Sequence, residues 1–289
     1  RCGGVIRDRR RAFNALHGRR AGRSLGAMKV LVTGSRGTVG QALARELGAQ
    51  QHAVVAWSRE QAPPDRPEEQ ERYIAEVAPD AVFHLAVPSR GTGRPEEGRL
   101  VNVTWSEHLA RLTAARGIPF IFISTVMVFT DAARGPFSPD SAPDATEGYG
   151  GEKREAEQRV RATHPQARIA RLGWQIGAAD GSNNMVNHLE QQMKEQGVIK
   201  ASRRWKPACS FLDDTAAGLV RLMELPPDLY LFDSNRHWTF YDIAEALNHQ
   251  QGDRWNVQAT EDFIYDQRML DPRPGLPSLS ARLPDLSSS

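Results

Sequence analysis

The sequence predicts an α/β fold, with a doubly wound parallel sheet followed by a smaller α/β lobe. Two observations favour this fold class. From Met28 onward, short β-rich runs alternate with segments of helical periodicity, and one of these runs, residues 118–124, is almost wholly apolar. Strands that are buried on both faces of a parallel sheet have this composition, and helices connect such strands along the chain.

The expected elements follow in order along the chain. In the first half we expect strands at 29–33, 52–57, 81–86, 118–124 and 167–172, with helices at 39–47, 73–77, 101–115 and 149–163. The regularity weakens after Gly177. There we expect a helix at 185–196, a second that begins at a cap on Asp213 or Asp214 and runs to Leu225, and a short strand at 230–232. A third helix is expected at 239–248, where Thr239 and Asp242 form a capping box.

Composition excludes several classes of protein. The chain has 289 residues, of which 40% are hydrophobic and 25% charged, as in ordinary globular proteins. No stretch approaches the about 20 apolar residues of a membrane span. Cys2 and Cys209 are the only cysteines, which excludes a disulfide framework and favours a cytoplasmic location.

The charge is distributed unevenly. Residues 1–27 hold eight arginines and one acid, so the remainder carries 29 basic and 34 acidic residues and a net charge of −5. That remainder shows no basic stripe for nucleic acid. An arginine-rich leader could be a transit peptide or a nucleic-acid arm. Because Met28 directly precedes the first strand, we expect 1–27 to be a disordered leader or an expression remnant.

The first motif, residues 33–40 (Thr-Gly-Ser-Arg-Gly-Thr-Val-Gly), lies between the first strand and the first helix. Glycines let the backbone approach a pyrophosphate, and the helix N-terminus offers N–H groups to its charge. Loops also collect glycine for steric reasons. The strand–turn–helix context nevertheless favours a dinucleotide site.

A second motif, Tyr149-Gly150-Gly151-Glu152-Lys153, opens a predicted helix. Tyr149 and Lys153 share one helix face, and the ammonium is expected to lower the pKa of the phenol and make it a usable acid. Such a pair also arises by chance. It gains meaning from Ser124-Thr125, which end the preceding apolar strand where ligands bind in open sheets. A turn in which these hydroxyls bond their own backbone is the alternative for Ser124-Thr125.

Together these residues resemble the extended short-chain dehydrogenase/reductase family over nearly all of residues 28–289. Within it, the chain is similar to dTDP-4-dehydrorhamnose reductases and related nucleotide-sugar reductases. The likeness is carried by residues 79–86, 124–129, 149–153 and 171–174, and by Arg273-Pro274 with Ser278-Leu279. It implies a Rossmann-type dinucleotide-binding domain over 28–175 and a smaller, intertwined substrate lobe over 176–289.

The resemblance also implies an activity, the NAD(P)H-dependent reduction of a keto group on a small-molecule nucleotide sugar. Tyr149 would donate the proton, Lys153 would tune it and bind the nicotinamide ribose, and Thr125 would orient the carbonyl. The cofactor contacts would be Gly34, Ser35, Arg36, Gly37, Thr38, Val39, Gly40, Ser58, Arg59, Leu85, Ala86, Val87, Asn102, Tyr149 and Lys153. The substrate contacts would be Ser89, Met127, Trp174, Asn183 and Asn184.

Charge at the end of the second strand favours NADPH over NADH. An acid there would bind a ribose 2′-hydroxyl, whereas this strand ends Trp57-Ser58-Arg59. Arg36 and Arg59 can both reach a 2′-phosphate, and Ser58 can add a hydrogen bond. If both arginines are merely solvated, NADH is the alternative. No metal-ligand cluster can be recognised in the sequence.

Two departures from the related reductases leave alternatives open. Val126 and Met127 stand where those reductases commonly have Asp-Tyr, which argues against rhamnose chemistry, and the Asp-Glu pair of sugar dehydratases is absent. The alternatives are a nucleotide-sugar epimerase, a reductase of another small carbonyl, and a non-catalytic NAD(P)-binding regulatory subunit like that of methionine adenosyltransferase. The family also favours a homodimer through two long helices of each subunit.

Overall fold

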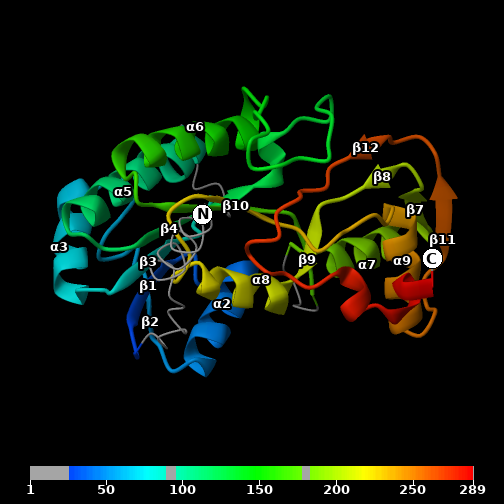
Figure 1. The fold of residues 1–289 in the computed structure, drawn as a ribbon, viewed down its shortest axis with the longest axis horizontal. Coiled ribbons are helices and arrows are strands. Elements are labelled where there is room, and N and C mark those ends of the chain that lie inside the picture. Colours follow the sequence, from blue (N-terminus) through cyan, green and yellow to red (C-terminus); the bar gives the residue numbers. More distant parts are fainter. Residues whose placement is uncertain (1–25, 89–95, 178–182, 289) are drawn as a thin grey trace, which may run out of the picture.

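Figure 1 shows a computed structural model of the chain, in which residues 26–88, 96–177 and 183–288 are described. The predicted leader lies outside the described residues, apart from residues 26 and 27. Six parallel strands form one sheet in the order β10-β5-β4-β3-β1-β2, which confirms the predicted doubly wound fold. These strands are β1 (Lys29–Thr33), β2 (Ala53–Ala56), β3 (Ala81–His84), β4 (Phe120–Thr125), β5 (Arg168–Leu172) and β10 (Leu229–Phe232).

Helices cover both faces of this sheet (Figure 1). On one face lie α2 (Thr38–Ala49) and α8 (Leu212–Arg221), and on the other lie α3 (Pro67–Val77), α5 (Trp105–Ala115) and α6 (Gly148–Thr163). A π-helical turn, Leu100–Thr104, leads into α5 within the predicted helix 101–115. Each helix of the described residues is too short or too polar to cross a bilayer.

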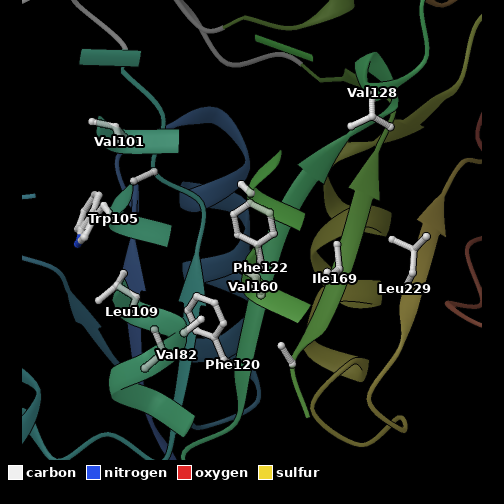
Figure 2. Close-up of a cluster of buried hydrophobic side chains, with 14 of the residues drawn as sticks. Val82, Val101, Trp105, Leu109, Phe120, Phe122, Val128, Val160, Ile169 and Leu229 are labelled. Atoms are coloured by element: carbon white, nitrogen blue, oxygen red, sulfur yellow. The ribbon is translucent and has the colours of Figure 1, made fainter. Parts of the chain in front are cut away.

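Alternate residues of the strands enter two separate cores. In β4, Phe120 and Phe122 pack beneath α5 and α6 (Figure 2), whereas Ile121 and Ile123 pack on the side of α2 and α8. Each of these four side chains is at least nine-tenths buried, and burying one such side chain contributes about 1.5–3 kcal/mol. The apolar composition of 118–124 therefore has the predicted cause, burial on both faces.

The strand order reverses at β1. Strand β2 pairs with one side of β1 and β3 pairs with the other. The loops that follow β1 and β3 therefore diverge in opposite directions at the carboxyl edge of the sheet. Open α/β sheets bind ligands at such a switch point. Thr33 and His84 are register partners at the ends of these two strands, and the glycine-rich loop begins directly after Thr33.

The smaller lobe contains α7 (Met185–Gln196), α9 (Phe240–Gln250) and three two-stranded parallel pairs around a third core. The pairs are β6 (Trp174–Ile176) with β9 (Cys209–Phe211), β7 (Ile199–Ser202) with β11 (Val257–Thr260), and β8 (Trp205–Lys206) with β12 (Tyr265–Asp266). The chain returns from this lobe to the large sheet through α8 and β10 (Figure 1). The two parts are thus intertwined, and the division at residue 175 stays a proposal.

The start of α8 differs from the prediction. Phe211, the last residue of β9, is its N-cap, and neither Asp213 nor Asp214 caps it. Strand and helix follow each other without a linker, so both acids fall in the first helical turn, where they face the positive end of the helix dipole. Asp214 also accepts two hydrogen bonds from Arg282, at 2.8 and 2.5 Å.

The capping box of α9 is confirmed. The Thr239 hydroxyl accepts a hydrogen bond from the Asp242 amide at 3.2 Å, and the Asp242 carboxylate accepts one from the Thr239 amide at 2.9 Å. We expect Thr239→Ala to lower the free energy of unfolding by about 1 kcal/mol, because a first-turn amide loses its partner. Urea denaturation would measure this loss, and an unchanged midpoint and slope would contradict the prediction.

Candidate active site

The loop between β1 and α2 is closely packed. Gly34 has φ +68°, and a Cβ there would lie 2.9 Å from the Ala86 nitrogen. A Cβ on Gly40 would lie 2.1 Å from the Gly34 carbonyl oxygen. Both positions therefore require glycine. Gly37 is the N-cap of α2 and brings no side chain to cap it, so the first N–H groups of a 12-residue helix point out at the switch point as an anion site.

A buried chain of hydrogen bonds, which the sequence analysis missed, supports this edge of the sheet. The Thr33 hydroxyl accepts from the amides of Leu85 and Ala86, both at 3.1 Å. Its own proton therefore goes to His84 Nδ1, 2.7 Å away. His84 Nε2 in turn donates to Ser106 Oγ at 2.9 Å, whose proton goes to the Asn102 carbonyl at 2.8 Å.

These bonds fix His84 as a neutral imidazole, because its Nδ1 must accept. Burial, together with the positive charges of Lys153 and Arg59, holds the pKa of His84 well below its usual range. The imidazole thus orients the loop after β3 without titrating near neutral pH. A histidine in an otherwise apolar strand was the one signal in the sequence for this contact.

Arg36 and Arg59 are near enough for their charges to interact. Burial lowers the pKa of Arg59. The negative charge of Glu97 opposes this lowering, and the like charge of Arg36 adds to it. The Arg59 guanidinium lies 5.4 Å from the Trp105 ring centroid and donates to the Val87 carbonyl at 3.5 Å. The Ser58 hydroxyl accepts from the Gln61 amide at 3.3 Å.

The Tyr149 helix packs directly on the end of β4. Gly150 is buried, and a Cβ there would lie 2.0 Å from the Met127 carbonyl oxygen. The Thr125 hydroxyl, at the end of β4, accepts from the Met127 amide at 3.2 Å. Lys153 is 1% exposed, and its ammonium donates to the Ile123 carbonyl at 2.9 Å. The helix thus places Lys153 against β4, at whose end Thr125 lies, with Tyr149 one helical turn before Lys153.

The pKa values of Tyr149 and Lys153 correct one expectation. Desolvation of the phenol, although the residue as a whole is 38% exposed, and the negative charge of Glu152 raise the pKa of Tyr149 to about 12, whereas the sequence led us to expect a lowered value. Lys153 does not lower it, because its own burial lowers the pKa of the ammonium to about 7 and its Nζ lies 6.0 Å from the Tyr149 ring centroid. At neutral pH the phenol is protonated, as a proton donor must be.

Asn102 connects the π-helical turn to the same helix. Its side-chain nitrogen donates to Glu152 at 2.8 Å, while its buried Oδ1 has no hydrogen-bond partner within the described residues. A Cβ on Gly98 would lie 2.8 Å from the Glu152 carboxylate, so the absence of a side chain at position 98 leaves room for that carboxylate. An unpartnered buried acceptor on the side chain that holds Glu152 fits the predicted contact with a cofactor.

The predicted substrate residues occupy different environments. Met127 is 53% exposed at the edge of β4, and Trp174 stacks with Trp205 and Phe240, its ring centroid 6.2 and 6.0 Å from theirs. Asn184 is buried as the N-cap of α7, where its oxygen accepts from the Asn187 amide at 3.0 Å. The remaining two are Asn183, which is exposed, and Ser89, which lies outside the described residues.

A parallel sheet with a glycine-rich loop at its switch point, and a tyrosine–lysine helix at the same edge, is the architecture of the extended short-chain dehydrogenases/reductases. Residues 28–267 match the family described as the RmlD substrate binding domain. The chain belongs to this family. In the described residues, no three His, Cys, Asp or Glu side chains gather as metal ligands.

Individual proteins similar to this chain include members of the same family. The dTDP-4-dehydrorhamnose reductase of Burkholderia thailandensis is 31% identical over 76% of this chain and 77% of its own length. Methionine adenosyltransferase 2 subunit beta of Xenopus tropicalis is 24% identical over 87% of this chain and 80% of its own. The dTDP-4-dehydrorhamnose reductase from Bacillus anthracis, solved in complex with NADP, superposes with a TM-score of 0.76 at 18% identity, over 91% of this chain and 100% of that one.

Proposed function

We propose that this chain is an NADPH-dependent reductase of a keto group on a nucleotide-activated sugar. The observation that carries the proposal is the packing of the Tyr149 helix on the end of β4, where Gly150 meets the Met127 carbonyl and Lys153 binds the Ile123 carbonyl. The reductase of Burkholderia thailandensis supports the substrate class, and the NADP complex of the Bacillus anthracis enzyme supports the cofactor.

Each catalytic side chain has one task in this proposal. NADPH, when bound, would supply the hydride for the carbonyl carbon, and Tyr149 is the donor of the proton to the carbonyl oxygen, so that the ketone becomes an alcohol. Lys153, as an ammonium, would donate a hydrogen bond to the nicotinamide ribose, and the phenolate regains its proton from solvent. Thr125 keeps its hydroxyl proton for the same carbonyl oxygen, because its bond to the Met127 amide uses it only as an acceptor.

The residues at the switch point fit a phosphorylated dinucleotide. The close approaches at Gly34 and Gly40, with the uncapped start of α2, leave the backbone open to a pyrophosphate. Arg36 and Arg59 repel each other, and an anion between them would relieve this repulsion. We therefore assign the pyrophosphate to the glycine-rich loop and the 2′-phosphate to the two arginines.

Removing both guanidiniums tests the choice of cofactor. We expect Arg36→Ala/Arg59→Ala to weaken NADPH binding about a hundredfold, because two charge-assisted contacts are lost, and to weaken NADH binding less than about threefold. Tryptophan fluorescence titration with each cofactor measures both affinities. Arg45→Ala, an exposed arginine of α2 (side chain 66% exposed), is the matched control. If the affinities for NADPH and NADH fell by the same factor, these arginines would not select for a 2′-phosphate.

Net consumption of NADPH tests the reaction itself. With dTDP-4-dehydrorhamnose and other nucleotide 4-keto sugars, the proposal requires stoichiometric loss of NADPH absorbance, whereas an epimerase returns its cofactor unchanged. The likeness to methionine adenosyltransferase 2 subunit beta makes a regulatory subunit the second candidate. A protein that binds NADPH tightly but oxidises it with none of these sugars would favour that candidate.

A further inference from the structure

A buried ion pair lies beneath the Tyr149 helix. The Glu157 carboxylate accepts two hydrogen bonds from Arg171 of β5, at 2.9 Å from Nε and 2.7 Å from Nη2. The two side chains are only 8% and 4% exposed. The Arg171 guanidinium also lies 5.2 Å from the Phe129 ring centroid, and its Nη1 has no partner within the described residues. The reaction proposed above uses neither residue.

This pair stands next to the buried lysine of the active site. Glu157 follows Lys153 by four residues on α6, so the two side chains are neighbours on one buried face. Around the ammonium, β4 offers only the Ile123 carbonyl and the face of the Phe122 ring, 4.7 Å away. An ammonium in such surroundings is stable only with a negative charge nearby.

The charged and titratable groups near Lys153 come from three elements. On α6 these are Tyr149, which is protonated, and the carboxylates Glu152 and Glu157. From β3 comes His84, which is neutral. From β5 comes Arg171, which carries a like charge and holds both Glu157 oxygens by hydrogen bonds.

We infer that Glu157 is a positioning residue that keeps Lys153 in its ammonium form, and that Arg171 limits this effect by holding the carboxylate toward β5. The two members of the pair thus act on Lys153 with opposite signs. Only the consequence for turnover rests on the proposed function; the titration of Lys153 does not.

The balance of effects at Lys153 agrees with this inference. Burial lowers the pKa of Lys153 to about 7, and Glu157, followed by Glu152, opposes that lowering. Because the value lies near neutrality, a small change in the field at this lysine changes the fraction of enzyme that holds the ammonium.

The titration can be measured directly, without cofactor or substrate. The chain has five lysines, so NMR of protein carrying ¹³C-labelled lysine gives few signals, and Lys153→Met identifies the one in question. The pH midpoint of that signal is then compared among the full-length wild type, Glu157→Gln, Arg171→Met and the double variant. Glu155→Gln, on the same helix and paired with Arg99 and Arg159, is the matched control.

We expect Glu157→Gln to lower the midpoint by about one pH unit, because an opposite charge is lost and Arg171 remains. We expect Arg171→Met to raise the midpoint and Glu155→Gln to leave it unchanged. Loosening of the fold would instead raise the midpoint in every variant, toward the value of about 10.4 for free lysine. A Glu157→Gln midpoint equal to or above that of the wild type would overturn the inference.

The double variant covers the case in which Glu157→Gln, with its unpaired buried arginine, does not fold. It leaves no buried partner unpaired, and its midpoint should lie below the wild-type value, because the lost carboxylate is the group that opposes the lowering of the Lys153 pKa. A midpoint at or above the wild-type value would equally overturn the inference. If the midpoints shift as expected but turnover does not become more sensitive to alkaline pH, the proposed role of Lys153 fails and the inference stands.

Discussion

Replacing Tyr149 by phenylalanine should remove most of the turnover and leave NADPH binding and the fold unchanged. The substitution deletes the hydroxyl that donates the proton, while the ring keeps its contacts with the helix and with Lys153. General acid catalysis of this kind contributes about 10²–10⁴-fold, and we expect a loss of kcat in that range. Steady-state kinetics of NADPH oxidation give kcat, and fluorescence titration gives the NADPH affinity.

The matched control for this variant is Tyr241→Phe. Tyr241 is partly buried in the smaller lobe, where the Arg203 guanidinium lies 4.6 Å from its ring centroid. Losing that hydroxyl should leave kcat unchanged. If Tyr149→Phe turned over as fast as this control, Tyr149 would not be the proton donor, and the second candidate function would gain weight.

Gly40→Ala should abolish cofactor binding through crowding alone. Its Cβ would lie 2.1 Å from the Gly34 carbonyl oxygen and 2.8 Å from the Ser35 Cα. That carbonyl cannot simply move aside, because it accepts the Gly37 amide at 3.0 Å. The loop or the start of α2 must shift, which should weaken NADPH binding at least about a hundredfold, since the backbone N–H groups leave their positions. Overpacking should also cost about 1–3 kcal/mol of stability.

A second glycine of the same helix separates crowding from helix propensity. A Cβ on Gly48 would meet nothing within 4 Å, so Gly48→Ala should raise the free energy of unfolding by up to about 1 kcal/mol and leave NADPH binding unchanged. Thermal unfolding and fluorescence titration compare the two variants. The crowding argument fails if Gly40→Ala binds NADPH as tightly as Gly48→Ala does.

Local patterns in the sequence predict much of this fold. The apolar run 118–124 predicts a strand buried on both faces, and Thr239 with Asp242 predicts the start of α9. The glycine-rich loop is predicted by its place between a strand and a helix, because the positive φ of Gly34 and the close approach of Gly40 to the Gly34 carbonyl belong to that local turn. In each case residues close together in the sequence determine the structure.

The supporting contacts of the site could not be predicted in this way. Thr33 meets His84 across 51 residues, and Lys153 meets the Ile123 carbonyl across 30. The first contact depends on the order of strands in the sheet, and the second on how α6 packs against β4. The reversed direction of the Tyr149 pKa has the same origin, because a helical spacing shows that Lys153 is near but not that its ammonium is buried. The role of Asn184 as the N-cap of α7 was likewise not predicted, and its contact with a substrate stays a prediction.

The late position of β10 bears on how the chain folds during synthesis. This edge strand pairs with β5, and 56 residues separate Leu172 from Leu229, including α7 and the strands β6 to β9. When the nascent chain has emerged from the ribosome only as far as residue 175, the β5 edge of the sheet still exposes unpaired backbone groups. Nascent chains can aggregate through such an edge. The large sheet is complete only after α7 and β9 of the smaller lobe have emerged. Separate expression of residues 28–175 should consequently give an insoluble fragment, although the glycine-rich loop, Tyr149 and Lys153 all lie within it.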